Sequence, residues 1–144
     1  MTRISFYILK SSQEHDRQVF ACRLIEKAHA KGNQIYIHAD SQEQANQFND
    51  LLWSFRSNSF VPHQLMYDTS QTTQDDCPIL IGYEATPPRL MNLLINLSSE
   101  QPIFFSQFER VAEFINDNET TKAQGRERYQ FYKERGYELE SHKL

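Results

Sequence analysis

Apolar residues occupy every second position near the start of the chain, at Ile4, Phe6 and Ile8. A period of two predicts a β-strand. Further on, apolar residues recur every three to four positions, at Ala21, Leu24, Ile25 and Ala28. This spacing predicts a helix, with Ser11 and Glu14 as a capping box at its start and Gly32 at its end.

The strand-then-helix pattern is repeated once in the following residues. Residues 34–39 predict a second strand, and Ser41 with Gln44 forms a second possible capping box. The helix after it carries its apolar face at Ala45, Phe48 and Leu52. This order of elements is typical of parallel strands joined by crossover helices.

Apolar runs predict three more strands, at 78–83, 91–97 and 111–115, although the last run also fits a helical turn. Continuous apolar runs suit strands that are covered on both faces. Residues 68–76 are polar and predict a loop, and no internal repeat or domain boundary is visible. The chain is therefore expected to form one α/β domain over 1–144, with three layers and a mostly parallel, Rossmann-like sheet.

The last predicted element is a basic helix that begins at Asn118 and ends at Gly136. At about 100° per residue, four of its side chains fall within an arc of roughly 60°: Lys122, Arg126, Tyr129 and Lys133. Cations around an aromatic ring suit an acidic peptide tail that ends in a large apolar side chain. The alternative is an ordinary solvated helix face.

Composition narrows the class of protein. The chain has 144 residues, is 39% hydrophobic and carries a net charge of −4, which argues against a dedicated DNA-binding protein. The charge is uneven, because residues 122–135 contain five cations and two anions and so carry +3. Cys22 and Cys77 are isolated, and no signal peptide or membrane-spanning run is visible, so a cytoplasmic protein is expected.

Motifs for catalysis and cofactor binding are absent from the sequence. The first strand-to-helix turn, residues 9–13, has no glycine to cradle a phosphate, so no nucleotide cofactor is expected. His38 lies at the end of the second predicted strand and is followed by Asp40, and Asp76 could approach them. A small-molecule enzyme at His38 and Asp40 therefore remains one alternative, and a single-stranded nucleic-acid-binding module that uses the basic helix is another.

Several aromatic residues follow the second predicted helix, where polar residues and a proline end it. Trp53 and Phe60 are expected on or near a loop, as anchors of a protein interface. Phe55 and Val61 are expected in the core instead. Cys22 is likewise expected to be a core residue, because it lies in an apolar helix run.

Five sequence features occur in a fixed order: Phe-Tyr-Ile-Leu at 6–9, Leu-Trp at 52–53, Ser-Phe-Val-Pro-His at 59–63, Leu-Ile-Asn-Leu at 94–97, and Arg-Glu-Arg-Tyr-x-x-Tyr at 126–132. In order, spacing and total length they resemble the chi subunit family of bacterial DNA polymerase III holoenzyme. The resemblance covers essentially the whole chain.

This resemblance implies a non-catalytic α/β subunit without a cofactor. It implies that the psi subunit binds the chain and tethers it to the clamp loader. It also implies binding of the acidic, phenylalanine-ended C-terminal tail of single-stranded-DNA-binding protein, so that DNA is contacted only indirectly. A helicase-like repair protein is expected to share the psi surface, and no membrane partner is implied.

Matching positions carry the tail site onto Lys122, Arg126 and Tyr129, with Ile115 lining the pocket for the terminal ring and Lys133 further along the helix. The psi and helicase surface carries over onto Trp53 and Phe60. Two positions depart from some members of the family. Gln130 replaces a basic residue, and Gly125 lies inside the helix, where glycine costs about 1 kcal/mol relative to alanine.

Overall fold

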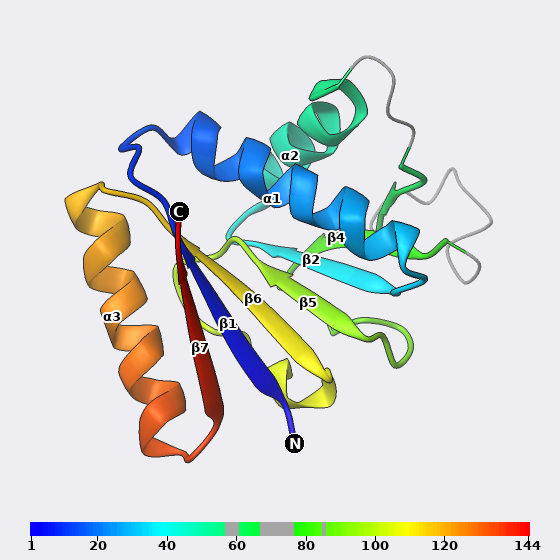
Figure 1. Cartoon of the computed structure of the whole chain (residues 1–144). Helices are drawn as coiled ribbons and strands as arrows, with labels where there is room; N and C mark the ends of the chain where they lie inside the picture. Colours follow the sequence, from blue (N-terminus) through cyan, green and yellow to red (C-terminus); the bar gives the residue numbers. More distant parts are fainter. Residues whose placement is uncertain (57–60, 67–76, 85) are drawn as a thin grey trace.

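The computed structural model describes residues 1–56, 61–66, 77–84 and 86–144. These residues form a parallel seven-stranded sheet in the order β3-β4-β2-β5-β6-β1-β7 (Figure 1). The strands are β1 Arg3–Ile8, β2 Ile35–Ala39, β3 Gln64–Leu65, β4 Ile79–Tyr83, β5 Leu93–Asn96, β6 Arg110–Ile115 and β7 Glu138–Lys143. The helices are α1 Glu14–Ala30, α2 Gln42–Ser54 and α3 Glu119–Glu134, with a 3₁₀ turn over Phe105–Gln107.

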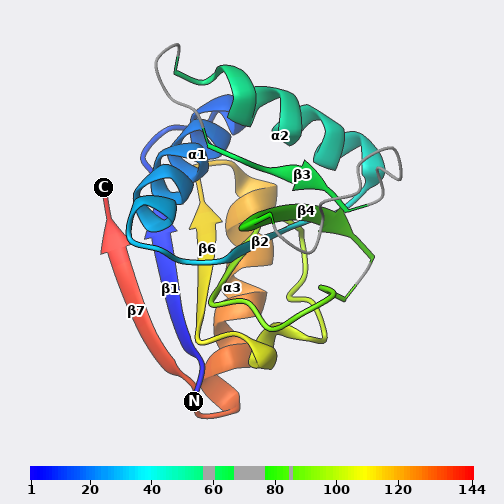
Figure 2. The same ribbon diagram turned by 90° about the vertical axis from the view of Figure 1, so that its right-hand side faces the viewer.

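The molecule has three layers. Helices α1 and α2 cover one face of the sheet, and α3 covers the other (Figures 1 and 2). The apolar side chains form one core on each face, the first around Phe48 and Phe114 and the second around Phe6 and Tyr132. The predicted α/β class with a parallel sheet is confirmed.

The predicted strands are confirmed in the expected order, including β6, where the apolar pattern also fitted a helical turn. Two strands were missed: β3, which has two residues, and β7, which follows α3. The prediction that the basic helix is the last element was therefore wrong. β7 is an edge strand of mostly exposed side chains, so it has no buried apolar pattern to reveal it.

The two predicted capping boxes have different outcomes. Ser41 caps α2, because its Oγ accepts from the Gln44 N–H at 3.1 Å, and the Gln44 side chain accepts from the Asp40 N–H. The box at Ser11 was wrong, because α1 begins after Gln13. The Ser11 Oγ instead accepts from the Gln13 N–H and donates to Asp16, so it shapes the turn before the helix.

The topology creates a crevice at one end of the sheet. β1 and β6 are neighbours, but α1 follows β1 onto one face of the sheet and α3 follows β6 onto the other (Figure 1). Two adjacent strands whose helices diverge define a topological switch point. In open α/β sheets, ligands bind outside the carboxyl ends of the strands at such a point.

Candidate functional site

Helix α3 has well-defined ends. The Asn118 side chain accepts from the backbone N–H groups of Thr120 and Thr121, which caps the start of the helix. The chain leaves the helix through Gly136, whose φ of 79° lies in the left-handed region that favours glycine. The predicted start and end residues of the helix are therefore confirmed.

One side of α3 is buried at Gly125, Arg128 and Tyr132. The side chains that the sequence grouped together lie beside this buried side; we call Lys122, Arg126, Tyr129 and Lys133 the outer face. Arg126 and Lys133 are exposed. Within the part of the chain that the structure describes, neither of them forms an ion pair.

Tyr129 anchors the outer face to the core. Its ring is half-buried and packs at a centroid distance of 5.3 Å against Phe6 of β1. This contact leaves part of the ring accessible between the exposed cations. The arrangement offers an apolar surface with positive charge around it.

Ile115, at the end of β6, lies directly beneath the helix. A Cβ atom at position 125 would lie 2.8 Å from Ile115 Cγ1 and closer still to Cδ1. Gly125 therefore permits a close approach between helix and strand. The sequence analysis treated this glycine only as a cost to the helix and did not predict the contact. Ile115 remains half-buried beside the outer face.

Lys122 differs from the other two cations of the outer face. Its Nζ lies 3.1 Å from an Asp117 oxygen and 3.2 Å from a Glu119 oxygen. Hydrogen bonds to Asp117 and then Glu119 raise the pKa of Lys122 above its usual value. Much of its charge is therefore already balanced.

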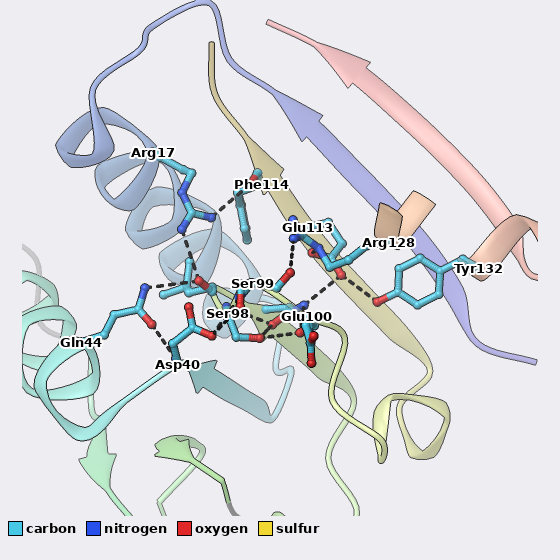
Figure 3. Close-up of polar contacts among 12 residues, drawn as sticks. Arg17, Asp40, Gln44, Ser98, Ser99, Glu100, Glu113, Phe114, Arg128 and Tyr132 are labelled. Carbon is cyan, nitrogen blue, oxygen red and sulfur yellow. Dashed lines mark hydrogen bonds and ion pairs between the residues drawn. The ribbon is translucent and has the colours of Figure 1, made fainter. Parts of the chain in front are cut away.

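A buried polar network holds the inner side of α3, and the sequence analysis did not anticipate it. Glu113 of β6 is fully buried and accepts from Arg128 Nε at 2.8 Å, from the Tyr132 hydroxyl at 2.7 Å and from Asn96 Nδ2 at 3.0 Å (Figure 3). Arg128 Nη1 also donates to the Ser99 carbonyl. The available signal was a lone glutamate inside the apolar run 111–115.

The predicted psi and helicase surface is only partly described. Trp53 lies inside the last turn of α2, not on a loop, and remains 45% exposed. Its ring packs at 4.0 Å on His63, whose burial lowers its pKa. Phe60 lies outside the described residues. Val61 is buried as predicted, and Phe55 is half-buried against the core.

The structure describes only part of the alternative enzyme site at His38 and Asp40. His38 is half-buried at the end of β2, and burial lowers its pKa. The Asp40 carboxylate accepts from the Ser99 N–H and hydroxyl (Figure 3), and Asp76 lies outside the described residues. In the described ranges, no three His, Cys, Asp or Glu side chains are placed to hold a metal ion.

Two further observations bear on the sequence-based predictions. Cys22 is fully buried, and its burial raises the pKa of the thiol to about 12, as expected of a core residue and not of a nucleophile. Among the described helices, none combines the length and the apolar character needed to cross a bilayer.

The chain is similar to known proteins over nearly its whole length. Residues 1–140 match the family model for "DNA polymerase III chi subunit, HolC". DNA polymerase III subunit chi of Pseudomonas aeruginosa is 37% identical over 144 residues, covering 100% of this chain and 98% of that protein. The Haemophilus influenzae protein of the same name is 32% identical, covering 93% of this chain and 92% of that protein. The Escherichia coli K12 one is 24% identical, with 96% of each chain covered.

A solved structure supports the fold alone. The crystal structure of T4 UvsW superposes with a TM-score of 0.69 at 11% identity. The match covers 99% of this chain but 41% of that one. At such low identity, the likeness concerns the arrangement of helices and strands only.

Proposed function

The chain belongs to the DNA polymerase III chi subunit family, and from this premise we propose that it is a non-catalytic adaptor in DNA replication. In this proposal it links the clamp loader, through psi, to the C-terminal tail of single-stranded-DNA-binding protein in the bacterial cytoplasm. The observation that carries the tail-binding part is the exposed Arg126, without an ion pair in the described chain, beside the anchored ring of Tyr129.

The proposed tail site combines charge and apolar surface. Arg126 and Lys133 supply positive charge to the carboxylates of the tail, and the guanidinium of Arg126 can engage one carboxylate through two N–H groups. The half-buried Tyr129 and Ile115 supply apolar surface for the terminal phenylalanine. Lys122 contributes less, since Asp117 and Glu119 already pair with it.

Such a site is expected to bind weakly and to be sensitive to salt, because its charges are exposed. Weak binding suits a partner that presents several copies of one tail. Multiple tails raise the effective concentration, so avidity compensates for a modest affinity at each site.

The tail site can be tested by replacing Arg126 with alanine. We expect binding of a fluorescent acidic tail peptide to weaken by about 1.5–3 kcal/mol, the scale of a hydrogen bond to a charged group. The stability of the fold should change by less than about 0.5 kcal/mol, because Arg126 is exposed. Fluorescence anisotropy measures the first quantity and urea unfolding the second.

Two controls make this test specific. Arg23→Ala removes the same charge from an exposed position on α1, which lies on the other face of the sheet, and should leave peptide affinity unchanged. A peptide without its terminal phenylalanine should bind poorly to every variant. Unchanged affinity in Arg126→Ala would remove this residue from the tail site.

The psi surface is the second part of the proposal, and Trp53 carries it among the described residues. Truncation of a central aromatic anchor costs about 2 kcal/mol or more in an interface. We therefore expect Trp53→Ala to lose co-purification with psi while its circular dichroism spectrum is retained. Ile103→Ala is the matched control, because Ile103 is 95% exposed elsewhere on the surface. Normal psi binding by Trp53→Ala would contradict the assignment.

A further inference from the structure

A polar cavity of about 310 Å³ opens at the topological switch point. We call it the crevice pocket. Residues that follow β1, β2, β5 and β6 line it together with the first turns of the helices: Ser12, Glu14, Arg17, Asp40, Gln44, Leu97, Ser98, Ser99, Asn116, Asn118, Thr121, Gln124 and Arg128. This is the position at which open parallel sheets bind their ligands.

Arg128 reaches the crevice pocket with unused donors. The residue is only 3% exposed. Its Nε donates to Glu113 and its Nη1 to the Ser99 carbonyl, whereas its Nη2 amino group has no partner among the described residues (Figure 3). A guanidinium carries five N–H donors, so three of them remain for the cavity.

Asn116 adds a second unpaired donor to the same cavity. It is 2% exposed, and its Oδ1 accepts from the Asn118 N–H at 3.1 Å. Its Nδ2 group forms no hydrogen bond within the described chain. Both unpaired groups belong to buried residues and face one cavity, where they are accessible to water or to a ligand.

The unpaired donors of the crevice pocket, more than its net charge, indicate which ligand it would take. Arg17 is paired with Glu14, and Arg128 with Glu113. Among the residues that line the cavity, Asp40 is left as a carboxylate without a cation, and Ser99 donates to it twice. The unused groups of Arg128 and Asn116 are donors, which suit oxygen atoms that carry negative charge.

We propose that the crevice pocket binds a small oxyanion, a carboxylate or phosphate group, through Arg128 Nη2 and Asn116 Nδ2. The site is independent of the proposed tail site, because Arg128 and Arg126 are two residues, or about 200°, apart around the helix. The first strand-to-helix turn has no glycine, so a cradle for a dinucleotide pyrophosphate is absent and the ligand is small.

The experiment is a titration of the ¹⁵N-labelled full-length chain followed by NMR. Sodium phosphate and sodium acetate are added in separate arms, with sodium chloride at matched ionic strength as the reference. We expect saturable shifts of the Asn116 side-chain amide and the Arg128 Nε–H. A response to phosphate alone identifies a phosphate ligand, a response to acetate alone a carboxylate, and a response to both the shared oxyanion chemistry. Absence of both responses, or equal shifts with chloride, overturns the proposal.

Variants that leave the buried network intact provide a second measurement. Gln124→Glu places a carboxylate at the cavity without changing side-chain size, and should weaken oxyanion binding about tenfold or more. Ala123→Glu adds the same charge to an exposed position of α3 outside the cavity, so it should leave oxyanion binding unchanged. Asp40→Asn removes the repelling charge and keeps an acceptor for Ser99, so affinity should rise. Equal affinities in all three variants would overturn the proposal.

Discussion

Arg126 and Arg128 are separated by one residue on α3, yet their surroundings are opposite. Arg126 is exposed and has no ion pair in the described chain, whereas Arg128 is 3% exposed and binds Glu113 and the Ser99 carbonyl. The comparison teaches that a charge count along a helix does not measure the charge it offers to a partner. The side of the helix on which an arginine lies decides whether its charge is available to a partner or is used within the fold.

This distinction reduces the basic patch that the sequence indicates. Of the five cations in 122–135, Arg128 is paired with Glu113 and Lys122 with two carboxylates. Arg135 lies over the Phe131 ring at 3.8 Å. Arg126 and Lys133 are therefore the cations that the proposed tail site offers most freely.

The strongest test of the comparison is the unfolding free energy. Arg128→Ala removes one partner of a fully buried pair and leaves the Glu113 carboxylate without its cation, so stability should fall by about 3–5 kcal/mol. Arg126→Ala should change it by less than about 0.5 kcal/mol. Urea unfolding at neutral pH measures both. Similar losses in the two variants would show that the division into inner and outer sides is wrong.

A double variant sharpens this result. Arg128→Met together with Glu113→Gln removes both charges and keeps much of the buried volume. Because most of the single-variant loss comes from an unpaired buried charge, the double variant should recover part of it. A double variant that is less stable than Arg128→Ala would indicate that hydrogen-bond geometry, and not charge, dominates the network.

Local patterns in the sequence were enough to predict most of the sheet and the outer face. The strands β1, β2, β4, β5 and β6 carry their own apolar periodicity, and the helix ends carry their own signals at Asn118 and Gly136. The grouping of Lys122, Arg126, Tyr129 and Lys133 needed only the helical period. These features depend on residues that are close in the sequence.

The features that were missed depend on residues far apart in the sequence. Glu113 meets Arg128 only because α3 folds back over β6. The crevice pocket assembles residues that follow four different strands. β7 is held by pairing with β1 and not by its own apolar pattern, so its polar sequence gave no sign of a strand.

A smaller effect is expected at Gly125, where the inner side of the helix touches the strand. Gly125→Ala gains about 1 kcal/mol of helix propensity, but the new methyl group overlaps Ile115, and overpacking of this kind costs about 1–3 kcal/mol. We expect a net loss of about 1 kcal/mol in thermal or urea unfolding. In an Ile115→Ala background, which lacks both Cγ1 and Cδ1, the same substitution should become neutral or stabilising relative to Ile115→Ala alone. If Gly125→Ala stabilises the unmodified chain, the close approach does not constrain this position.

The smallest expected effect concerns Lys122, the cation of the outer face that already has partners. Because Asp117 and Glu119 pair with it, Lys122→Met should weaken tail-peptide binding no more than about fivefold, less than Arg126→Ala does. Asp117→Asn should act in the opposite direction, since it removes one of the two carboxylates that pair with Lys122 and a charge that repels the acidic tail. Its gain in affinity should shrink in the Lys122→Met background and fade as salt is raised, because the pair is exposed. Fluorescence anisotropy at two salt concentrations measures these changes. If Lys122→Met lost as much peptide affinity as Arg126→Ala, pairing with Asp117 and Glu119 would not reduce the contribution of Lys122 to tail binding.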